Sequence, residues 1–479
     1  MDWFGAGDFE VARLVLQRGV AAAYLIAFVS TINQFPALLG EHGLLPAPRL
    51  LARTRFRELP SLFHWRYSDR MLLALAWCGA AVSVTLVLGL PQLGPPWLPM
   101  LAFLLLWAGY LSIVNVGQSF YGFGWESLLL EAGFVVAFLG STEVAPPLLI
   151  IIYLRWLLFR LELGAGLIKI RGGREWRDFT ALDYHHETQP MPNPLSRLAH
   201  HLPRWFHRCE VFGNHVAELL VPFFLFAPQP VASVAAGVLI GTQLWLIVTG
   251  NFAWLNWLTI VLAFSAIDDG TIRAMLPVLP SGPAPADAPA WFVALVLAAS
   301  ALLAVLSWWP ARNLFSRQQL MNASFNRYHL VNAYGMFGTV TKRRLEVIVE
   351  GCDDVEPGDG AVWLAYEFRG KPGDPMRMPR QFAPYHLRLD WLMWFLALGS
   401  RDTRWFEVFL VRLLEGDRRT LRMLRVNPFT QEPPRWVRAR VFLYRFSTRA
   451  ERRASGARWV RSEVGELVEP VSLRQLGLR

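Results

Sequence analysis

Continuous apolar runs fill the first two thirds of the chain, and short polar or proline-rich stretches separate them. A helix needs about 20 mostly apolar residues to cross a bilayer. The runs do not alternate between apolar and polar positions, which indicates helices rather than strands. We predict eight or nine transmembrane helices, near residues 19–33, 71–90, 97–115, 126–141, 147–167, 215–228, 231–249, 252–267 and 290–309.

From residue 312 onward, shorter patterns replace the long apolar runs. Alternating apolar and polar positions predict strands at 344–350, 362–368 and 437–446. Helical spacing predicts helices at 389–398, 405–414 and 420–426. The sequence thus predicts a polytopic α-helical membrane protein with a C-terminal α+β soluble domain. Residues 1–311 would form the membrane domain, with a polar loop at 170–212, and residues 312–479 the soluble domain.

Charge separates the same two parts of the chain. Residues 1–311 hold 18 basic and 19 acidic side chains, whereas residues 312–479 hold 29 and 18, so the formal net charge of +10 belongs to the tail. The basic residues of the tail are interspersed with acids and follow no recognised nucleic-acid module. We therefore expect the tail to face anionic lipid head groups, and we expect no nucleic-acid partner.

Three arginine-rich stretches bear on orientation: the loop after the first apolar run, the loop after the fifth, and the tail. Basic residues in short loops concentrate on the cytoplasmic side of a membrane. With nine helices, all three stretches fall on one side. We predict that this side is cytoplasmic and that the N-terminus lies outside.

The most informative polar stretch inside the apolar part is RLELGAGLIKIRGGREW, from Arg160 to Trp176. An ionisable group at membrane depth costs several kcal/mol unless it is paired or hydrated. Glu162 and Lys169 bracket the small residues 164–166, where another helix or a ligand could approach closely. A second interpretation, which the position favours, places Lys169 at a helix end with its ammonium reaching the head groups.

Two acids, Glu126 and Glu131, stand at the start of an apolar run and need donors there. Arg155 and Arg160 of the next run are the donors that we expect, and a structural charge pair is favoured over a catalytic acid.

His185 and His186 could supply metal ligands or acid–base groups. Adjacent histidines rarely ligate one metal ion from a loop, and no partner ligand has the spacing of a known motif. We therefore expect a polar interfacial loop and no metal site. The three cysteines show no CxxC pair, and patterns such as GxGxxG, GxSxG and HExxH do not occur, so the sequence names no cofactor.

Six strings carry a resemblance to one family: LELGAGLIKIRG, ALDYHHETQPMPNPLS, NRYHLVNAYGMFGTVT, YEFRGKPGDP, APYHLRLDWLMWFLAL and NPF followed by a basic strand. From about residue 10 to about residue 447, the chain resembles the lipase maturation factor family. In animals that family is a polytopic membrane protein of the endoplasmic reticulum, needed for folding and assembly of secreted lipases. The membrane part is also distantly similar to the transmembrane region of vitamin K-dependent carboxylase, where a glycine-rich helix carries a catalytic lysine before a tryptophan. Lys169, followed by Trp176, would match that lysine.

The resemblance implies an integral membrane folding factor with a lipase as its client. Abundant arginine and rare lysine indicate a GC-rich, bacterial genome. The expected location is therefore the bacterial inner membrane, or the endoplasmic reticulum membrane if the source is eukaryotic. Aromatic side chains of the tail are the expected client contacts: Tyr328, Tyr334, Phe337, Trp391 and Trp394.

The alternative hypothesis is an intramembrane enzyme that acts on a lipid-like or quinone-like substrate. Lys169 would act as the base, and Glu126 or Glu131 as the acid. His185 or His186 would relay protons. If these side chains line one enclosed cavity, the enzyme hypothesis gains support.

Overall fold

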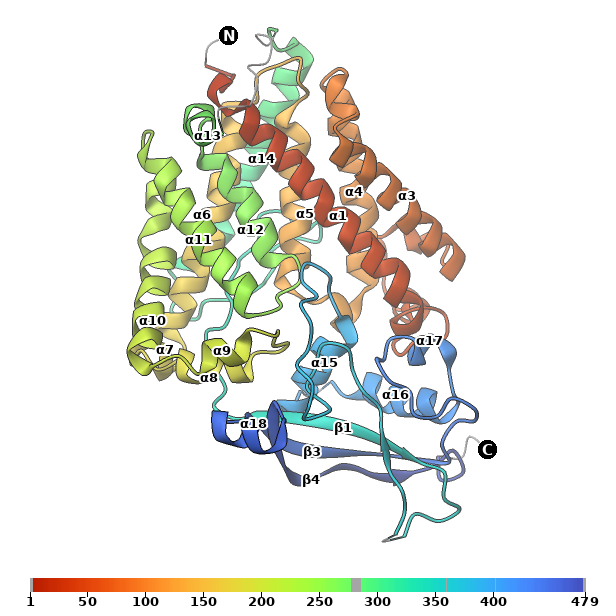
Figure 1. Ribbon diagram of the computed structural model, residues 1–479. Helices are drawn as coiled ribbons and strands as arrows, with labels where there is room; N and C mark the ends of the chain where they lie inside the picture. The colour runs from red at the N-terminus through yellow and green to blue at the C-terminus, as the bar shows by residue number, and fades with distance from the viewer. Residues whose placement is uncertain (1–2, 277–285, 359, 401, 477–479) are drawn as a thin grey trace.

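The computed structural model describes residues 3–276, 286–358, 360–400 and 402–476. A bundle of long helices forms the larger part of the molecule, and a small antiparallel sheet lies across one end of the bundle (Figure 1). The N-terminus lies at the opposite end from the sheet (Figure 1). The predicted fold class, a polytopic helical membrane protein with a C-terminal α+β part, is confirmed.

Helices occupy all nine predicted apolar segments, although α10 ends at Leu219 and a separate 3₁₀ helix, Val221–Phe226, continues the segment predicted at 215–228. The corresponding helices are α1 (Glu10–Leu38), α3 (Asp69–Leu88), α4 (Trp97–Val116), α5 (Gly124–Val136), α6 (Leu148–Arg171), α10 (Arg204–Leu219), α11 (Val231–Thr249), α12 (Leu255–Ala263) and α14 (Ala290–Leu314). Short helices connect them: α2 (Ala47–Leu51), α7 (Arg174–Arg177), α8 (Leu182–Thr188), α9 (Ser196–His200) and α13 (Asp269–Met275).

Within the described ranges, 6 helices are long and apolar enough to cross a membrane. They are Gly7–Leu38, Asp69–Leu88, Trp97–Val116, Arg204–Phe226, Val231–Thr249 and Ala290–Leu314. Of the other three segments, α6 has 24 residues but carries several charged side chains, and α5 and α12 are short, with 13 and 9 residues. Length and polarity therefore distinguish these three helices from the six candidate spans.

The helix ends follow from local sequence. Ser68 caps α3 because its hydroxyl accepts a hydrogen bond from the Met71 amide, and Gly89 ends the same helix in the left-handed region at φ 82°. Pro147 precedes α6, where its fixed backbone suits a helix start.

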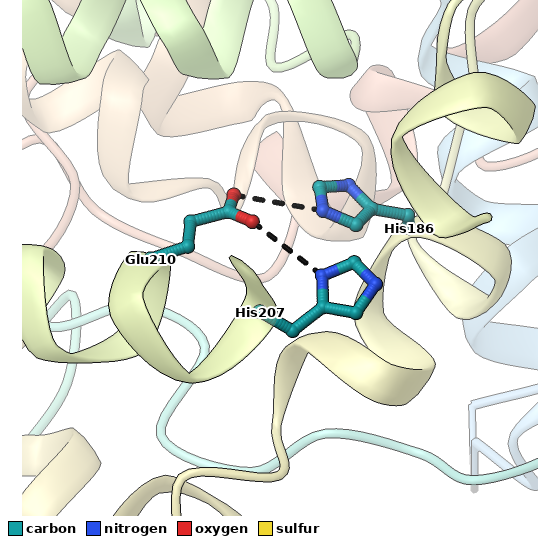
Figure 2. Close-up of side chains that lie close together, drawn as sticks. All are labelled: His186, His207 and Glu210. Carbon is teal, nitrogen blue, oxygen red and sulfur yellow. Dashed lines mark ion pairs between the residues drawn. The ribbon is translucent and has the colours of Figure 1, made fainter. Parts of the chain in front are cut away.

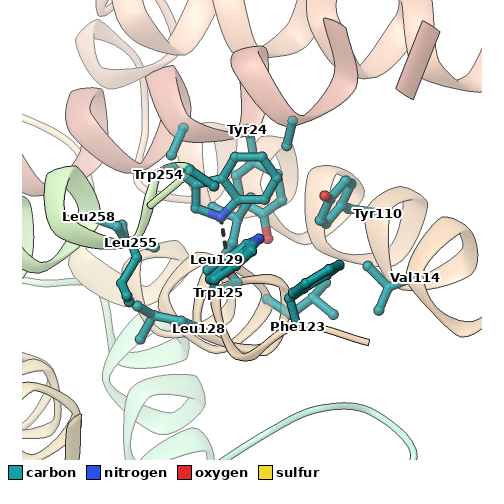
Figure 3. Close-up of a cluster of buried hydrophobic side chains, with 14 of the residues drawn as sticks. Tyr24, Tyr110, Val114, Phe123, Trp125, Leu128, Leu129, Trp254, Leu255 and Leu258 are labelled. Atoms are coloured by element: carbon teal, nitrogen blue, oxygen red, sulfur yellow. Dashed lines mark hydrogen bonds between the residues drawn. The ribbon is translucent and has the colours of Figure 1, made fainter. Parts of the chain in front are cut away.

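Aromatic packing holds the centre of the bundle together (Figure 3). Tyr24 of α1 meets Tyr110 of α4 edge to face, with ring centroids 5.8 Å apart. The indole N–H of Trp254, just before α12, donates to the carbonyl oxygen of Trp125 on α5 at 3.0 Å. Lipid tails are as apolar as these side chains, so close packing and hydrogen bonds, rather than removal from water, stabilise this core.

The C-terminal sheet has the order β2-β1-β3-β4 and is antiparallel throughout. Its strands are β1 (Arg344–Cys352), β2 (Leu364–Ala365), β3 (Trp436–Phe446) and β4 (Trp459–Val471). The helices of this part are α15 (Arg388–Ala397), α16 (Arg404–Leu414), α17 (Arg418–Leu421) and α18 (Arg449–Ser455). α15 and α16 lie between the sheet and the membrane helices (Figure 1).

Three details differ from the prediction. The strand expected at 362–368 is only two residues long, and the helix expected at 420–426 begins earlier and ends at Leu421. β4 was not predicted, because most of its side chains are exposed on both faces and show no apolar alternation. The tail nevertheless forms the expected α+β arrangement.

The three arginine-rich stretches lie together at the end of the bundle that carries the sheet (Figure 1). Arg419 of α17 pairs with Asp69 at 2.8 Å, and Lys342 pairs with Glu175 of α7 at 3.0 Å. This proximity matches the expectation that all three fall on one side. The side of the membrane on which they lie, and the division of the chain at residue 311, stay predictions.

Candidate functional site

A cavity of about 700 Å³ lies among α6, α8, α10, α11 and α12. Most of its lining is apolar, from side chains such as Leu161, Phe212 and Leu255. Its polar lining residues come from all five helices: Glu162, Lys169, His185, His186, Glu210, Asn214, Glu218, Gln243 and Asn256. Buried polar groups that converge in an apolar cavity are the usual mark of a ligand site.

The small residues of α6 bring the cavity walls together, as their position predicted. A Cβ at Gly164 would overlap the backbone oxygen of Tyr334, and a Cβ at Gly166 would lie 2.7 Å from the side chain of Leu219 on α10. Close approach of α10 and of the segment around Tyr334 therefore depends on these glycines.

Lys169 faces the cavity rather than the head groups, with 6% of its surface exposed. Its ammonium pairs with Glu218 of α10 at 2.5 Å, donates to the Asn214 side-chain oxygen at 3.0 Å and lies 4.7 Å from the Trp176 ring centroid. The head-group interpretation of Lys169 is therefore wrong, because the Glu218 carboxylate on α10 offsets the ammonium charge that water would otherwise have hydrated. An ammonium held in this way has no free lone pair, so the geometry does not favour a base.

Glu162 is the second buried ionisable group of α6. It accepts a hydrogen bond from the Gln243 side chain of α11 at 3.0 Å. With Glu210 and Glu218, three carboxyl groups line the cavity against one ammonium, that of Lys169. The cavity lining is therefore rich in acids.

His185 and His186 belong to a buried helix, α8, and not to the polar interfacial loop that the sequence predicts. The cause is the packing of α8 against α10, which places the ring of His186 5.7 Å from that of His207. Burial lowers the pKa of His185 to about 3, so this imidazole is neutral at physiological pH. Its ring stacks on Phe252 and meets Phe337 edge to face, and it lines the cavity as an uncharged group.

His186 forms a cluster with His207 and Glu210 of α10 (Figure 2). His186 Nε2 lies 3.5 Å from Glu210 Oε1, and His207 Nδ1 lies 3.6 Å from Glu210 Oε2. The three side chains offer ligand atoms that all lie within 4.8 Å of one another. Glu210 is not indicated by any sequence motif, although its spacing of three from His207 places both on one face of a helix.

Glu126 and Glu131 do not line this cavity. Glu131 pairs with Arg160, as expected, and also accepts hydrogen bonds from the Asn332 amide and the Tyr334 hydroxyl, both at 2.8 Å. The enzyme hypothesis therefore loses its proposed acid, since neither carboxyl group lines the cavity that holds Lys169.

Glu126 pairs with Arg388 of α15 at 2.5 Å and not with Arg155. Arg155 instead donates to the carbonyl oxygens of Ser265 and Leu225. The partner of Glu126 comes from the C-terminal part, 262 residues away, which spacing along the chain cannot indicate. Both acids thus tie the C-terminal part, or the segment leading to it, to the membrane helices.

The five aromatic residues expected to contact a client lie in different surroundings. Tyr334 and Trp391 are buried, with 1% and 3% exposed, which leaves no surface for a partner. Phe337 lines the cavity, and the partly buried Trp394 donates its indole N–H to the Thr188 carbonyl oxygen. Tyr328, with 47% exposed, remains open to contact.

Comparison with known proteins agrees with this architecture. The model of the lipase maturation factor transmembrane domain matches residues 11–274, and that of the lipase maturation factor C-terminal domain matches residues 330–469. Lipase maturation factor 1 of Mus musculus is 40% identical, with 98% of this chain and 88% of that protein covered. The Homo sapiens protein is also 40% identical, covering 98% and 89%.

Lipase maturation factor 2 of Gallus gallus is 30% identical, covering 96% of this chain and 81% of that protein. No solved structure matches the chain significantly. Two family models that together cover most of the chain, and relatives matched along nearly all of it, agree with the observed membrane bundle and its C-terminal sheet. The chain belongs to the lipase maturation factor family.

Proposed function

We propose that this integral membrane protein assists the folding or maturation of a lipase, or of another exported client. The observation that carries the proposal is the extent of the match: relatives named Lipase maturation factor 1 align with 98% of the chain, across both family regions. Because the match includes both the membrane part and the C-terminal part, it supports a function that needs both parts.

The joint between the two parts supports a role for a fixed surface rather than a mobile tail. Arg388 is fully buried and pairs with Glu126 of α5, and Arg344 of β1 donates to the backbone oxygen of Gln189 at 2.5 Å. Removing one partner of such a buried pair costs about 3–5 kcal/mol. The C-terminal part is therefore held against the membrane helices, where a client near the bilayer could meet it.

Exposed parts of this region are the proposed client surface. Tyr328 is the expected contact residue that retains a large exposed area. We place the client at the lipid surface on the arginine-rich side, in the inner membrane of a bacterium or the endoplasmic reticulum membrane of a eukaryote. Anionic lipid head groups would attract the basic tail there.

Deletion of the gene in its host tests the proposal. We expect lower activity of a secreted or membrane lipase with unchanged synthesis of the lipase polypeptide, and recovery when the gene is restored. A secreted enzyme that is not a lipase serves as the control for general export. Unchanged lipase activity across all exported lipases of the host would refute the proposal.

A further inference from the structure

The cluster of His186, His207 and Glu210 has features that a set of ordinary buried polar side chains lacks. His186 is 1% exposed, and neither of its ring nitrogens has a hydrogen-bond partner within the described residues. His207 Nδ1 and Glu210 Oε2 also have none there. Buried polar atoms are hydrogen-bonded in the great majority of cases, so four such atoms at one place require an explanation.

The hydrogen bond on the far side of the His207 ring fixes its tautomer. His207 Nε2 lies 3.3 Å from the carbonyl oxygen of His200. A carbonyl oxygen can only accept, so Nε2 carries the hydrogen, and Nδ1 of the neutral ring presents a lone pair. That lone pair faces the Glu210 carboxylate, another acceptor, at 3.6 Å. Two acceptors in contact are stable only with a positive charge between them, either a proton or a metal ion.

The distances suit a metal ion. Ligand atoms at the usual zinc distances of about 2.0–2.2 Å lie roughly 3.3–3.6 Å apart on a tetrahedron. Each histidine nitrogen faces a different oxygen of the Glu210 carboxylate, at 3.5 and 3.6 Å, which is close to that edge length. One ligand atom from each of the three residues lies within 4.8 Å of the other two. Two imidazoles and one carboxylate are also a common ligand set for zinc and for ferrous iron.

The surroundings supply the outer contacts that orient such ligands. The backbone carbonyl of His200 holds the His207 ring, and the indole N–H of Trp245 on α11 donates to Glu210 Oε1. Metal-bound histidines and carboxylates are usually held by partners of this kind. The cavity lining adds Glu162 and Glu218 against the single ammonium of Lys169, so a cation offsets an excess of acidic groups.

We propose that His186, His207 and Glu210 bind one divalent transition-metal ion of the zinc class. His186 and Glu210 line the cavity, so the remaining coordination position faces the cavity interior. The ion links α8, outside the spanning helices, to α10 within them, and it presents a Lewis-acidic centre to whatever occupies the cavity. This site replaces the expectation of no metal, which did not include Glu210. The proposal does not depend on the identity of the client.

Metal titration of the whole purified chain tests the site. The protein is purified in detergent through a tag without histidine, stripped with a chelator, and titrated with Co²⁺ while the visible absorption of the bound ion is recorded. We expect one saturable site per chain, displacement of cobalt by Zn²⁺, and a higher unfolding temperature with Zn²⁺ than without it.

The variants His186→Ala, His207→Ala and Glu210→Gln should each weaken cobalt binding by about 100-fold or more. Glu210→Gln keeps an oxygen for the Trp245 hydrogen bond and removes the charge, so it is the variant that disturbs folding least. His201→Ala is the matched control, because that histidine is exposed and hydrogen-bonded to the Arg197 carbonyl oxygen.

The absence of saturable cobalt binding by the native chain overturns the proposal and leaves a proton between His207 and Glu210. Equal affinity in Glu210→Gln and the native chain, or an equal loss in His201→Ala, overturns it as well. If an alanine variant does not fold, the native titration and the Glu210→Gln measurement still decide.

Discussion

Arg388→Met removes the positive charge on α15 that pairs with Glu126 of the membrane helix α5. The Arg388 and Glu126 side chains are both 0% exposed and lie 2.5 Å apart. Arg388 also donates to the Phe120 carbonyl oxygen at 2.9 Å and lies 3.4 Å from the ring centroid of Tyr121. The substitution keeps most of the side-chain volume but leaves the Glu126 carboxylate buried without its cation.

The expected cost is about 3–5 kcal/mol of unfolding free energy, the usual penalty for an uncompensated buried charge. The double variant Glu126→Gln/Arg388→Met should cost less than the sum of the two single variants, by about 1–3 kcal/mol, because it leaves no unpaired charge. Arg445→Met is the matched control. Arg445 is exposed and pairs with Glu451 on the surface of the C-terminal part, so its loss should cost about 1 kcal/mol or less.

Unfolding in detergent micelles, followed by circular dichroism against denaturant, measures all four variants. Loss of the β-sheet signal before the helical signal would show that the C-terminal sheet unfolds before the membrane helices. Additive costs for the double variant, or an Arg388→Met cost no larger than that of Arg445→Met, would refute the assignment of this pair as the joint between the two parts.

Three further substitutions test other parts of the account. Gly164→Ala places a methyl group against the backbone oxygen of Tyr334 and should lower the unfolding free energy by about 1–3 kcal/mol in the same assay. Gly237→Ala is its control: no described atom lies within 4 Å of the new methyl group, so the unfolding free energy should change by less than about 1 kcal/mol. Burial raises the pKa of Asp390 from 3.8 to about 6, so the charged form destabilises the fold most above pH 6 and progressively less as the pH falls towards 4. Asp390→Asn should therefore exceed the native chain in stability by about 3 kcal/mol at pH 7 and by about 1 kcal/mol at pH 4.5, and an equal difference at both pH values would contradict this. Lys169→Arg keeps the cation that pairs with Glu218, so lipase activity per lipase polypeptide should stay within about two-fold of the native value. Loss of that lipase activity in a folded variant would restore the hypothesis of a lysine base.

The sequence predicted the elements with strong patterns. All nine apolar runs are helices, and the alternating segments at β1 and β3 are strands. The glycines at 164 and 166 were recognised as points of close approach, and they are. These features depend on local composition and period, which a single sequence displays directly.

Features that depend on distant partners were harder to predict. Lys169 was assigned to the head groups because its counter-ion, Glu218, lies on a helix whose place beside α6 the sequence does not reveal. The partner of Glu126 comes from the other end of the chain, and the ligands beside His186 come from α10. β4 was missed because its exposed side chains give no apolar period. In each case tertiary pairing, rather than local pattern, decides the outcome.

The central claim is that this chain matures lipases, and the specific activity of a secreted lipase tests it most directly. Cells that lack their own Lipase maturation factor 1 would secrete a lipase with and without this protein inserted in their membranes, and the ratio of lipase activity to lipase mass in the medium would be measured. The account predicts a higher ratio with the protein and an unchanged rate of lipase synthesis. An unchanged ratio, with the protein folded and present in the membrane, would contradict it.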